Sequence, residues 1–394
     1  MRRLIQKSKR IYLFAVVGFA WLLVAPGGCT GTKPRTVTPS FALPPEFSTQ
    51  GVEEMPQEWW RSLDDVQLNA VVEEALAHNF TIRSAWARLT QAEQTAIKTG
   101  AGLYPSATYQ AGVERLGRRT SDNTTYTSNY SAGLVAAYEV DLWGRIGSAR
   151  NAAVLDAEAA QENVNAAAMT LTAAVGKTWY QLAEAKQQEQ IITQQIRTNE
   201  KILEVIKLQF RQAQVGAADV FSQQQLIQSS RGRLIQTQEN IALLQHQLSI
   251  LMGKTPGPWW SDRSIDLVTL GQLPKIDVPA VVIQRRPDVM SAYRVVQAAD
   301  QRLASAIADQ YPAISLSAGI ETSAARTRDL FDDWLANLAA NLTGPMFDAG
   351  LRKAEARRTR AGLSGKLQDY RQSVLERLQE TEDADRPGNH QPPS

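Results

Sequence analysis

The chain has 394 residues, with 42 Lys and Arg against 40 Asp and Glu, so its formal charge at pH 7 is +2. Segment 1–28 holds five basic residues and no acidic one, which leaves 2 − 5 = −3 for the remainder. A remainder so close to neutral argues against a nucleic-acid interface driven by charge. The length allows two ordinary domains or one elongated body.

Residues 1–28 have the pattern of a secretory signal peptide. A basic start is followed by an apolar run from Ile11 to Val24 and then by small residues up to Gly28. The run is only about 14 residues long, whereas a membrane-spanning helix needs ~20. A signal peptide is therefore favoured over a transmembrane anchor.

The only cysteine, Cys29, follows that segment directly and has no internal partner for a disulfide. Its position predicts lipidation of the thiol at the mature N-terminus. Pro26 stands where a Leu-like residue is usual for such a signal, so an unmodified thiol is the alternative. Residues 29–58 are rich in Thr and Pro and are predicted to form an N-terminal lipid-anchored tether. No other window approaches ~20 apolar residues, so any membrane crossing must use strands.

The first folded segment is predicted to be a helix over 63–100, followed by strands over 104–114 and 130–143. A polar turn over 117–128 joins the two strands. A helix of roughly 70 residues without proline then runs over 145–214.

A second long helix follows Val215-Gly216-Ala217, with Gly216 as the natural turn between two antiparallel helices. Its apolar residues recur at intervals of seven, which predicts helices packed side by side; they are Ile227, Leu234, Ile241 and Leu248. The remaining faces are rich in glutamine, as suits a wall with water on both sides.

After a non-helical connector over 253–277, the order of elements is repeated. A helix is expected over 280–309, strands over 311–322 and 334–347, and a last helix over 350–382. The four tryptophans at 59, 60, 259 and 260 are expected to pack around the connector.

The last strand alternates apolar and polar residues. Such alternation is typical of a transmembrane barrel strand, and a half-buried sheet in a soluble protein is the alternative. Four strands close only a very small barrel, so several chains would have to contribute. The apolar face holds Trp334, Ala336, Leu338, Ala340 and Leu342, and the polar face Asn337, Asn341 and Thr343.

The chain repeats itself at a distance of 207 residues, because 82–114 matches 289–321. We therefore expect a first structural repeat over 59–252 and a second, incomplete one over 278–383. A complete second copy would reach roughly residue 460, and the tail 384–394 stands apart.

Catalytic chemistry is not indicated. The three histidines (His78, His246 and His390) are far apart and have no metal-type spacing. Two Gly-Lys-Thr triplets lack the glycine that a phosphate loop needs five positions earlier, and there is no Gly-x-Ser-x-Gly elbow. We predict neither an enzyme nor a cofactor or metal site.

Four segments together resemble the outer-membrane efflux factors of the TolC family, in particular the lipoprotein branch similar to NodT and OprM. The likeness covers about 57–383. The segments are Trp59–Asp65, Tyr138–Arg145, Gln284–Val289 and Gly344–Asp348.

The resemblance implies a mainly α fold with membrane β-structure. In a homotrimer, each chain would give four strands to a twelve-stranded barrel in outer-membrane lipid, above long helical hairpins that form a periplasmic tunnel. The implied partners are a periplasmic adaptor (membrane fusion protein) and an inner-membrane pump, and the channel is a passive duct. The alternatives are a non-conducting, lipid-tethered interaction protein or a non-functional remnant of a channel.

The resemblance also implies site residues. Val215, Gly216 and Ala217 match the hairpin tip that docks on the adaptor. Asp219 is expected to contribute to a polar ring at the mouth, unless it only occupies a helix N-terminus. The family pattern includes a second hairpin, with its tip near residue 424 by the repeat distance. Without it, the apolar seam of 350–382 is expected to be exposed and to cause instability.

Overall fold

The computed structural model describes residues 53–54, 58–257, 267–268, 274–275 and 285–384. The predicted signal peptide, Cys29, nearly all of the tether, most of the connector with Trp259 and Trp260, and the tail beyond residue 384 lie outside the described residues.

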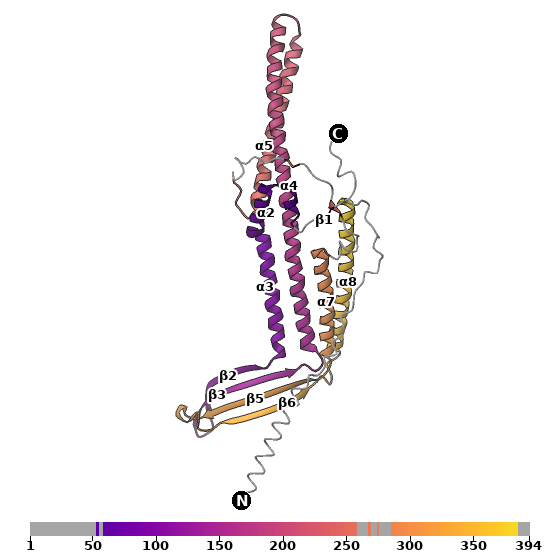
Figure 1. Ribbon diagram of the computed structural model, residues 1–394. Helices are drawn as coiled ribbons and strands as arrows, with labels where there is room; N and C mark the ends of the chain where they lie inside the picture. Colours follow the sequence, from indigo (N-terminus) through magenta and orange to yellow (C-terminus); the bar gives the residue numbers. More distant parts are fainter. Residues whose placement is uncertain (1–52, 55–57, 258–266, 269–273, 276–284, 385–394) are drawn as a thin grey trace.

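The protein is an elongated rod with a sheet at one end and a long helical hairpin at the other (Figure 1). The helices are α2 (Val66–His78), α3 (Phe80–Gly100), α4 (Arg145–Arg211), α5 (Ala217–Leu251), α7 (Pro287–Ala308) and α8 (Leu351–Ala384). The strands of the sheet are β2 (Ser106–Arg119), β3 (Thr124–Val140), β5 (Ala313–Ala324) and β6 (Leu335–Thr343). A short parallel pair joins β1 (Glu53–Glu54) to β4 (Pro274–Lys275). The predicted mainly helical fold with four strands is confirmed.

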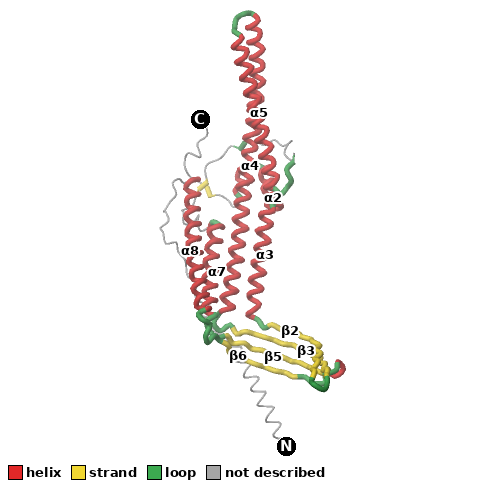
Figure 2. Tube along the Cα trace, turned by 180° about the vertical axis from the view of Figure 1, so that it is seen from behind, coloured by secondary structure: helices red, strands yellow, loops and turns green. Residues whose placement is uncertain are grey.

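Helices α3, α4, α7 and α8 lie side by side in one layer, and the α4–α5 hairpin extends beyond it, as Figure 2 also shows from behind. Among the described helices, none is both long and apolar enough to cross a membrane.

The predicted helix over 63–100 is in fact broken at Asn79, where α2 ends and α3 begins. The side chain of Asn79 is buried, and its Oδ1 accepts bonds from the N–H groups of Thr81 and Ile82 at 2.8 and 3.2 Å. Its Nδ2 donates to the carbonyl of Leu251 at 2.9 Å. The break thus depends on a contact between residues 172 positions apart, which local periodicity does not reveal.

The main core lies where α2 packs between α4 and α5. Trp179 of α4 is fully buried there, and its Nε1 donates to Asp65 Oδ2 at 2.8 Å. The same carboxylate caps α2 through its other oxygen, which accepts from the N–H of Gln67 and of Leu68, both at 2.9 Å. Trp60 joins this core and Trp59 packs against it. Packing of the tryptophans around the connector stays a prediction, because most of the connector lies outside the described residues.

The sheet is antiparallel throughout, in the order β2-β3-β5-β6. The first turn is much shorter than the predicted 117–128, because the strands continue to Arg119 and Thr124, and Thr120 N–H donates to Asn123 O at 2.8 Å. Arg118 and Arg119 were assigned to the turn, but they lie on a strand whose two faces are both exposed in the single chain.

The repeat predicted from the sequence appears as two copies of helix–strand–strand–helix, α3-β2-β3-α4 and α7-β5-β6-α8. Val113 of β2 corresponds to Ile320 of β5. After the hairpins the correspondence shifts by one residue, so that Gly144 before α4 matches Gly350 before α8. Both glycines have positive φ, 74° and 85° respectively. The domain division based on this repeat stays a prediction.

Candidate functional site

The tip of the long hairpin is a tight turn between α4 and α5. Helix α4 ends at Arg211, and Ala213 takes up the left-handed conformation at φ 57°. The N–H of Gln214 donates back to Gln209 O at 2.9 Å and so satisfies a carbonyl of the last turn. The predicted docking residues Val215, Gly216 and Ala217 are therefore brought together at the far end of the rod, where Gly216 and Ala217 are exposed.

Gly216 lies in the turn between α4 and α5, as predicted, but its backbone is not left-handed. It has φ −84° and ψ 164°, an extended conformation open to any residue, and it is the N-cap of α5. The left-handed position belongs to Ala213. A Cβ added at Gly216 would come no closer than 3.6 Å to Asp219 Oδ2 and 4.0 Å to Ala218 N. Within this chain, neither backbone strain nor crowding requires glycine here.

Asp219 lies in the first turn of α5 and caps its N-terminus. Its Oδ2 accepts from the N–H of Gly216 at 2.9 Å, and its own N–H donates to Gly216 O at 3.2 Å. This is the helix-N-terminal placement that the sequence left open as the alternative. The polar-mouth role of Asp219 stays a prediction.

Polar bonds cross the hairpin along its shaft. Gln223 Nε2 donates to the backbone oxygen of Asn199 at 3.0 Å and to its side-chain oxygen at 3.4 Å. Asn199 lies between the buried Ile196 and Leu203, so these bonds satisfy a polar residue in an otherwise apolar row of α4. Further along, Arg231 pairs with Glu200 at 2.7 Å. At 67 residues, α4 is about 100 Å long.

The sheet has two chemically different faces, because residues directly opposite each other in the antiparallel ladder share a face. Thus Tyr109 lies opposite Leu134, Leu134 opposite Ile320, and Ile320 opposite Ala336. The alternate face is polar, with Gly112, Ser131, Glu114, Asn129, Ser315, Asn341, Gly319 and Asn337 in its paired positions. The apolar face includes Ala107, Tyr109, Ala111, Val113, Tyr130, Ala132, Leu134, Ala136, Tyr138, Val140, Ile314, Leu316, Ala318, Ile320, Ala336, Leu338, Ala340 and Leu342.

The junction between sheet and helices is held by an aromatic stack. The rings of Trp143 and Tyr311 lie 4.9 Å apart and nearly parallel, and Trp143 Nε1 donates to Pro312 O at 2.7 Å. This contact joins the end of the first strand pair to the start of the second.

Charged groups secure the same junction. Arg145 pairs with Glu139 at 2.7 Å, and Arg352 pairs with Asp309 at 3.1 Å. Asp141 accepts bonds from two backbone N–H groups in the first turn of α4, at 3.0 and 2.6 Å. The junction borders an open pocket of about 290 Å³ that is lined by these side chains. Since its arginines are already paired with carboxylates, we assign it no ligand.

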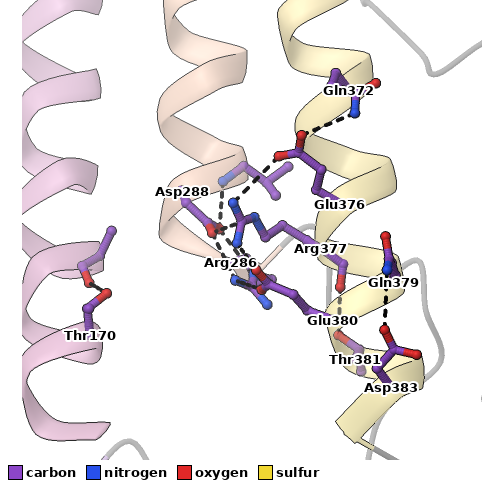
Figure 3. A network of polar contacts seen from close by, with 12 residues as sticks. Thr170, Arg286, Asp288, Gln372, Glu376, Arg377, Gln379, Glu380, Thr381 and Asp383 are labelled. Atoms are coloured by element: carbon purple, nitrogen blue, oxygen red, sulfur yellow. Dashed lines mark hydrogen bonds and ion pairs between the residues drawn. The ribbon is translucent and has the colours of Figure 1, made fainter. Parts of the chain in front are cut away.

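At the other end of α7, four charged side chains join this helix to α8 (Figure 3). Arg286 donates to both oxygens of Asp288, at 3.1 and 2.9 Å, and to Glu380 at 3.1 Å. Arg377 approaches Asp288 Oδ2 at 3.2 Å and also bonds to Glu380. We call Arg286, Asp288, Arg377 and Glu380 the α7–α8 clamp.

The clamp perturbs the pKa of Asp288. Burial raises this pKa, but the hydrogen bonds and charge of Arg286, the N–H of Val289 and the charge of Arg377 outweigh burial and hold it below the usual carboxyl value. Sequence reasoning used the Arg-Arg-Pro-Asp segment only as a mark of resemblance. One sequence feature could have indicated part of the clamp: Arg286 and Asp288 flank Pro287, which starts α7.

Within the described part of the chain, no group of three or more His, Cys, Asp or Glu residues is arranged to hold a metal ion. Cys29, the predicted lipidation site, lies outside the described residues.

Comparison with known proteins gives a consistent result. The sequence matches the family model of the outer membrane efflux proteins over residues 71–254 and 278–384. It is 28% identical over 372 residues to the pyoverdine export outer membrane protein OpmQ of Pseudomonas aeruginosa, covering 90% of this chain and 78% of the relative. It is 24% identical over 374 residues to the probable outer membrane lipoprotein SilC of Salmonella typhimurium, covering 90% of this chain and 79% of SilC. The fold is similar to that of the outer-membrane channel OprN, with a TM-score of 0.77 at 24% identity over 88% of this chain and 82% of OprN.

Proposed function

The chain belongs to the outer membrane efflux protein family, and we propose that it is the outer-membrane channel component of a tripartite efflux system. It acts as a passive duct and not as an enzyme: a pump in the inner membrane supplies the energy, and a periplasmic adaptor joins the pump to the channel. Three copies form the duct, each giving four strands to a twelve-stranded barrel and its helices to the tunnel below.

The observation that carries this proposal is the two-faced sheet. A sheet with one face apolar along four strands and the other polar suits a barrel wall between lipid and a water-filled lumen. Within the described residues, the outer edges of β2 and β6 have no strand partner. Long unpaired edges are a liability in a single chain, and closure into a barrel removes them.

The internal repeat specifies how one copy would pair with the next. Leu134 of β3 lies opposite Ile320 of β5. Their counterparts are Ala340 in β6 and Val113 in β2. If the contact between chains copies the contact within the chain, Ala340 lies opposite Val113 of the next copy. This register also keeps both apolar faces on the same side, which a slip by one residue would not.

Disulfide trapping tests the assembly. Cys29→Ser removes the only native cysteine, and Ala340→Cys with Val113→Cys is added. Directly opposite residues have Cα atoms about 4.5–5.5 Å apart, which lies within the range of about 4.4–6.8 Å that a disulfide spans. We expect crosslinked dimers and trimers from outer membranes on a non-reducing gel.

The matched control is Ala339→Cys with Val113→Cys, which places the two thiols on opposite faces and should not crosslink. Monomers with no crosslink from the first pair, in protein that reaches the outer membrane, would refute the trimer. Soluble monomers would instead support the tethered interaction protein.

At the other end of the duct, we propose that Val215, Gly216 and Ala217 dock on the adaptor. The support is the unexplained glycine. Its backbone is extended, and there is room for a side chain within this chain. A partner's backbone that approaches Gly216 closely would account for its identity. A ring of Asp219 carboxylates at the mouth is compatible with the capping bond, because an ionised carboxylate accepts several hydrogen bonds.

Two parts of the proposal lie outside the described residues. We propose that residues 1–28 direct export and that acylated Cys29 anchors the tether in the outer membrane. The exported substrate is left open, since a duct of this kind makes few specific contacts.

A further inference from the structure

The first turns of α8 carry a concentration of positive charge. Segment 351–366 contains six basic residues and one acidic residue, whereas 367–384 contains two basic and five acidic residues. Some of these residues are paired, for example Arg358 with Glu355 and Lys366 with Asp369. Lys353, Arg357 and Arg360 are exposed and have no ion pair within the described part of the chain. We call these three residues the basic stripe.

The basic stripe is not explained by the stability of its own helix. Positive charge in the first turn, where Lys353 lies, opposes the helix dipole and is unfavourable. Arg357 and Arg360 lie beyond that turn and gain nothing from the dipole. The stripe is not inherited from the repeat either, because the matching positions on α4 are Gly147, Asn151 and Val154.

The three side chains lie on one face of α8. At about 100° per residue, positions 353, 357 and 360 fall within roughly 60° of one another. The side chains that contact α7 are centred on another direction, and they include Leu363, Leu367, Tyr370 and Val374. Measured from the mean direction of these contacts, and in the sense in which the helix winds from its N-terminus, the stripe lies at roughly 50–110°.

The chirality of the chain shows which side of the layer this is. The bond from Thr120 N–H to Asn123 O shows that the N–H and C=O groups of even-numbered residues in β2 point toward β3. The side chains of odd-numbered residues, such as Val113, lie on the apolar face. Consider a view with the apolar face of the sheet toward the viewer and the hairpin pointing upward. In a chain of L-residues, this arrangement of the strands places α3, α4, α7 and α8 from left to right. Figure 1 shows the helices in the same order. A right-handed helix that runs upward with α7 on its left presents the basic stripe on that same, apolar side.

The stripe also lies at the level where the apolar surface of the sheet ends. It begins two residues into α8 and extends over roughly 10 Å of the helix. Met346 and Phe347, just before α8, are almost fully exposed, and the stacked Trp143 and Tyr311 are about half exposed. Aromatic side chains followed by basic ones are typical of the boundary between membrane and water.

We propose that Lys353, Arg357 and Arg360 bind the anionic headgroups of phospholipids in the periplasmic leaflet of the outer membrane. This inference rests on the proposed function, since it needs the sheet to cross that membrane. The stripe would fix the depth and orientation of each copy at the second strand pair. It could provide a positioning contact beside the lipid anchor predicted at Cys29.

Lipid titration by native mass spectrometry tests the proposal on the full chain purified in detergent. The probes are phosphatidylglycerol, which is anionic, and phosphatidylcholine, which is neutral overall. One basic side chain near an anionic surface is worth roughly a factor of five in binding. Three such factors multiply to roughly 100-fold, so replacing all three by glutamine should weaken phosphatidylglycerol binding by about that much and leave phosphatidylcholine binding unchanged.

The control is Arg197→Gln, Lys201→Gln and Arg211→Gln, which removes the same charge from exposed positions on the distant hairpin. It should bind both lipids as the unchanged protein does. Equal binding of the two lipids by the unchanged protein, or equal losses in both triple variants, would overturn the inference. Insertion into phosphatidylcholine vesicles is measured separately. Failure of the unchanged protein to insert would count against the proposed function, whereas insertion without preference for phosphatidylglycerol counts only against the stripe.

Discussion

The α7–α8 clamp provides a prediction whose magnitude follows from the structure. Asp288→Asn keeps the size of the side chain but removes the charge that faces Arg286 and Arg377. The side chains of Arg286 and Asp288 are 20% and 29% exposed, so the pair is only partly screened by water. Losing the charge-assisted bonds of a partly buried carboxylate costs about 1–3 kcal/mol.

Hydrogen exchange is the appropriate assay, because the clamp joins two helices locally and the whole rod need not unfold as one unit. Peptides from 286–296 and 370–384 should lose protection by roughly 5- to 100-fold, and peptides from the α2 core should not change. Asp369→Asn is the control. Its pair with Lys366 is exposed at 68% and 51%, and such surface pairs contribute at most ~1 kcal/mol.

The direction of the pH effect follows from the lowered pKa of Asp288. Its stabilising contribution is present above the usual carboxyl pKa of about 4 and is lost as the pH falls through its lower, folded-state value. Protection factors for the two clamp peptides should therefore fall on acidification below about pH 4, and fall less in Asp288→Asn. Equal protection in the unchanged protein and in Asp288→Asn, or an equal effect of Asp369→Asn, would refute this account of the clamp.

Three further predictions concern the tip, the anchor and the helix break. Gly216→Val should weaken crosslinking to the adaptor while trimers still form, because the extended backbone accepts valine. Gly232→Val, in open space midway along α5, should leave both crosslinking and trimers unchanged, and unaltered crosslinking in Gly216→Val would remove the docking assignment. Cys29→Ser should abolish labelling with radioactive palmitate, and persistent labelling would place the anchor elsewhere. Asn79→Ala removes a helix cap and its bond to Leu251 O and should lower the stability of the α2 core by about 1–3 kcal/mol; exchange at the α2–α3 junction that matches the unchanged protein would contradict this.

Long-range periodicity made much of the fold predictable. The heptads that include Ile227 and Ile241 identified the long hairpin, and both side chains are buried. The 207-residue repeat showed that the helix–strand–strand–helix order of the first half recurs in the second half. Alternation along the last strand identified the apolar face, since side chains of a strand alternate whether or not a partner is present.

The errors arose where structure depends on contacts distant in the sequence. The break at Asn79 requires the carbonyl of Leu251, and the clamp requires Arg377, about 90 residues beyond Arg286. The length of β2 was underestimated because a strand on a barrel wall needs no buried face within its own chain. At the tip, Gly216 lies in the predicted turn, but the left-handed residue is Ala213, whose sequence gives no sign of that conformation.

The distribution of burial along the rod explains how one chain can be firmly held in the middle and adaptable at its end. Near the sheet and α2, α4 is packed on several sides. Toward the tip, the last buried side chain of α4 is Leu203 and the first of α5 is Ile227. The outermost turns of both helices are held chiefly by backbone bonds and by polar bonds such as Gln223 to Asn199. Since segments with few buried contacts open at low free-energy cost, the tip is the part of this rod best able to adjust to a partner without disturbing the membrane end.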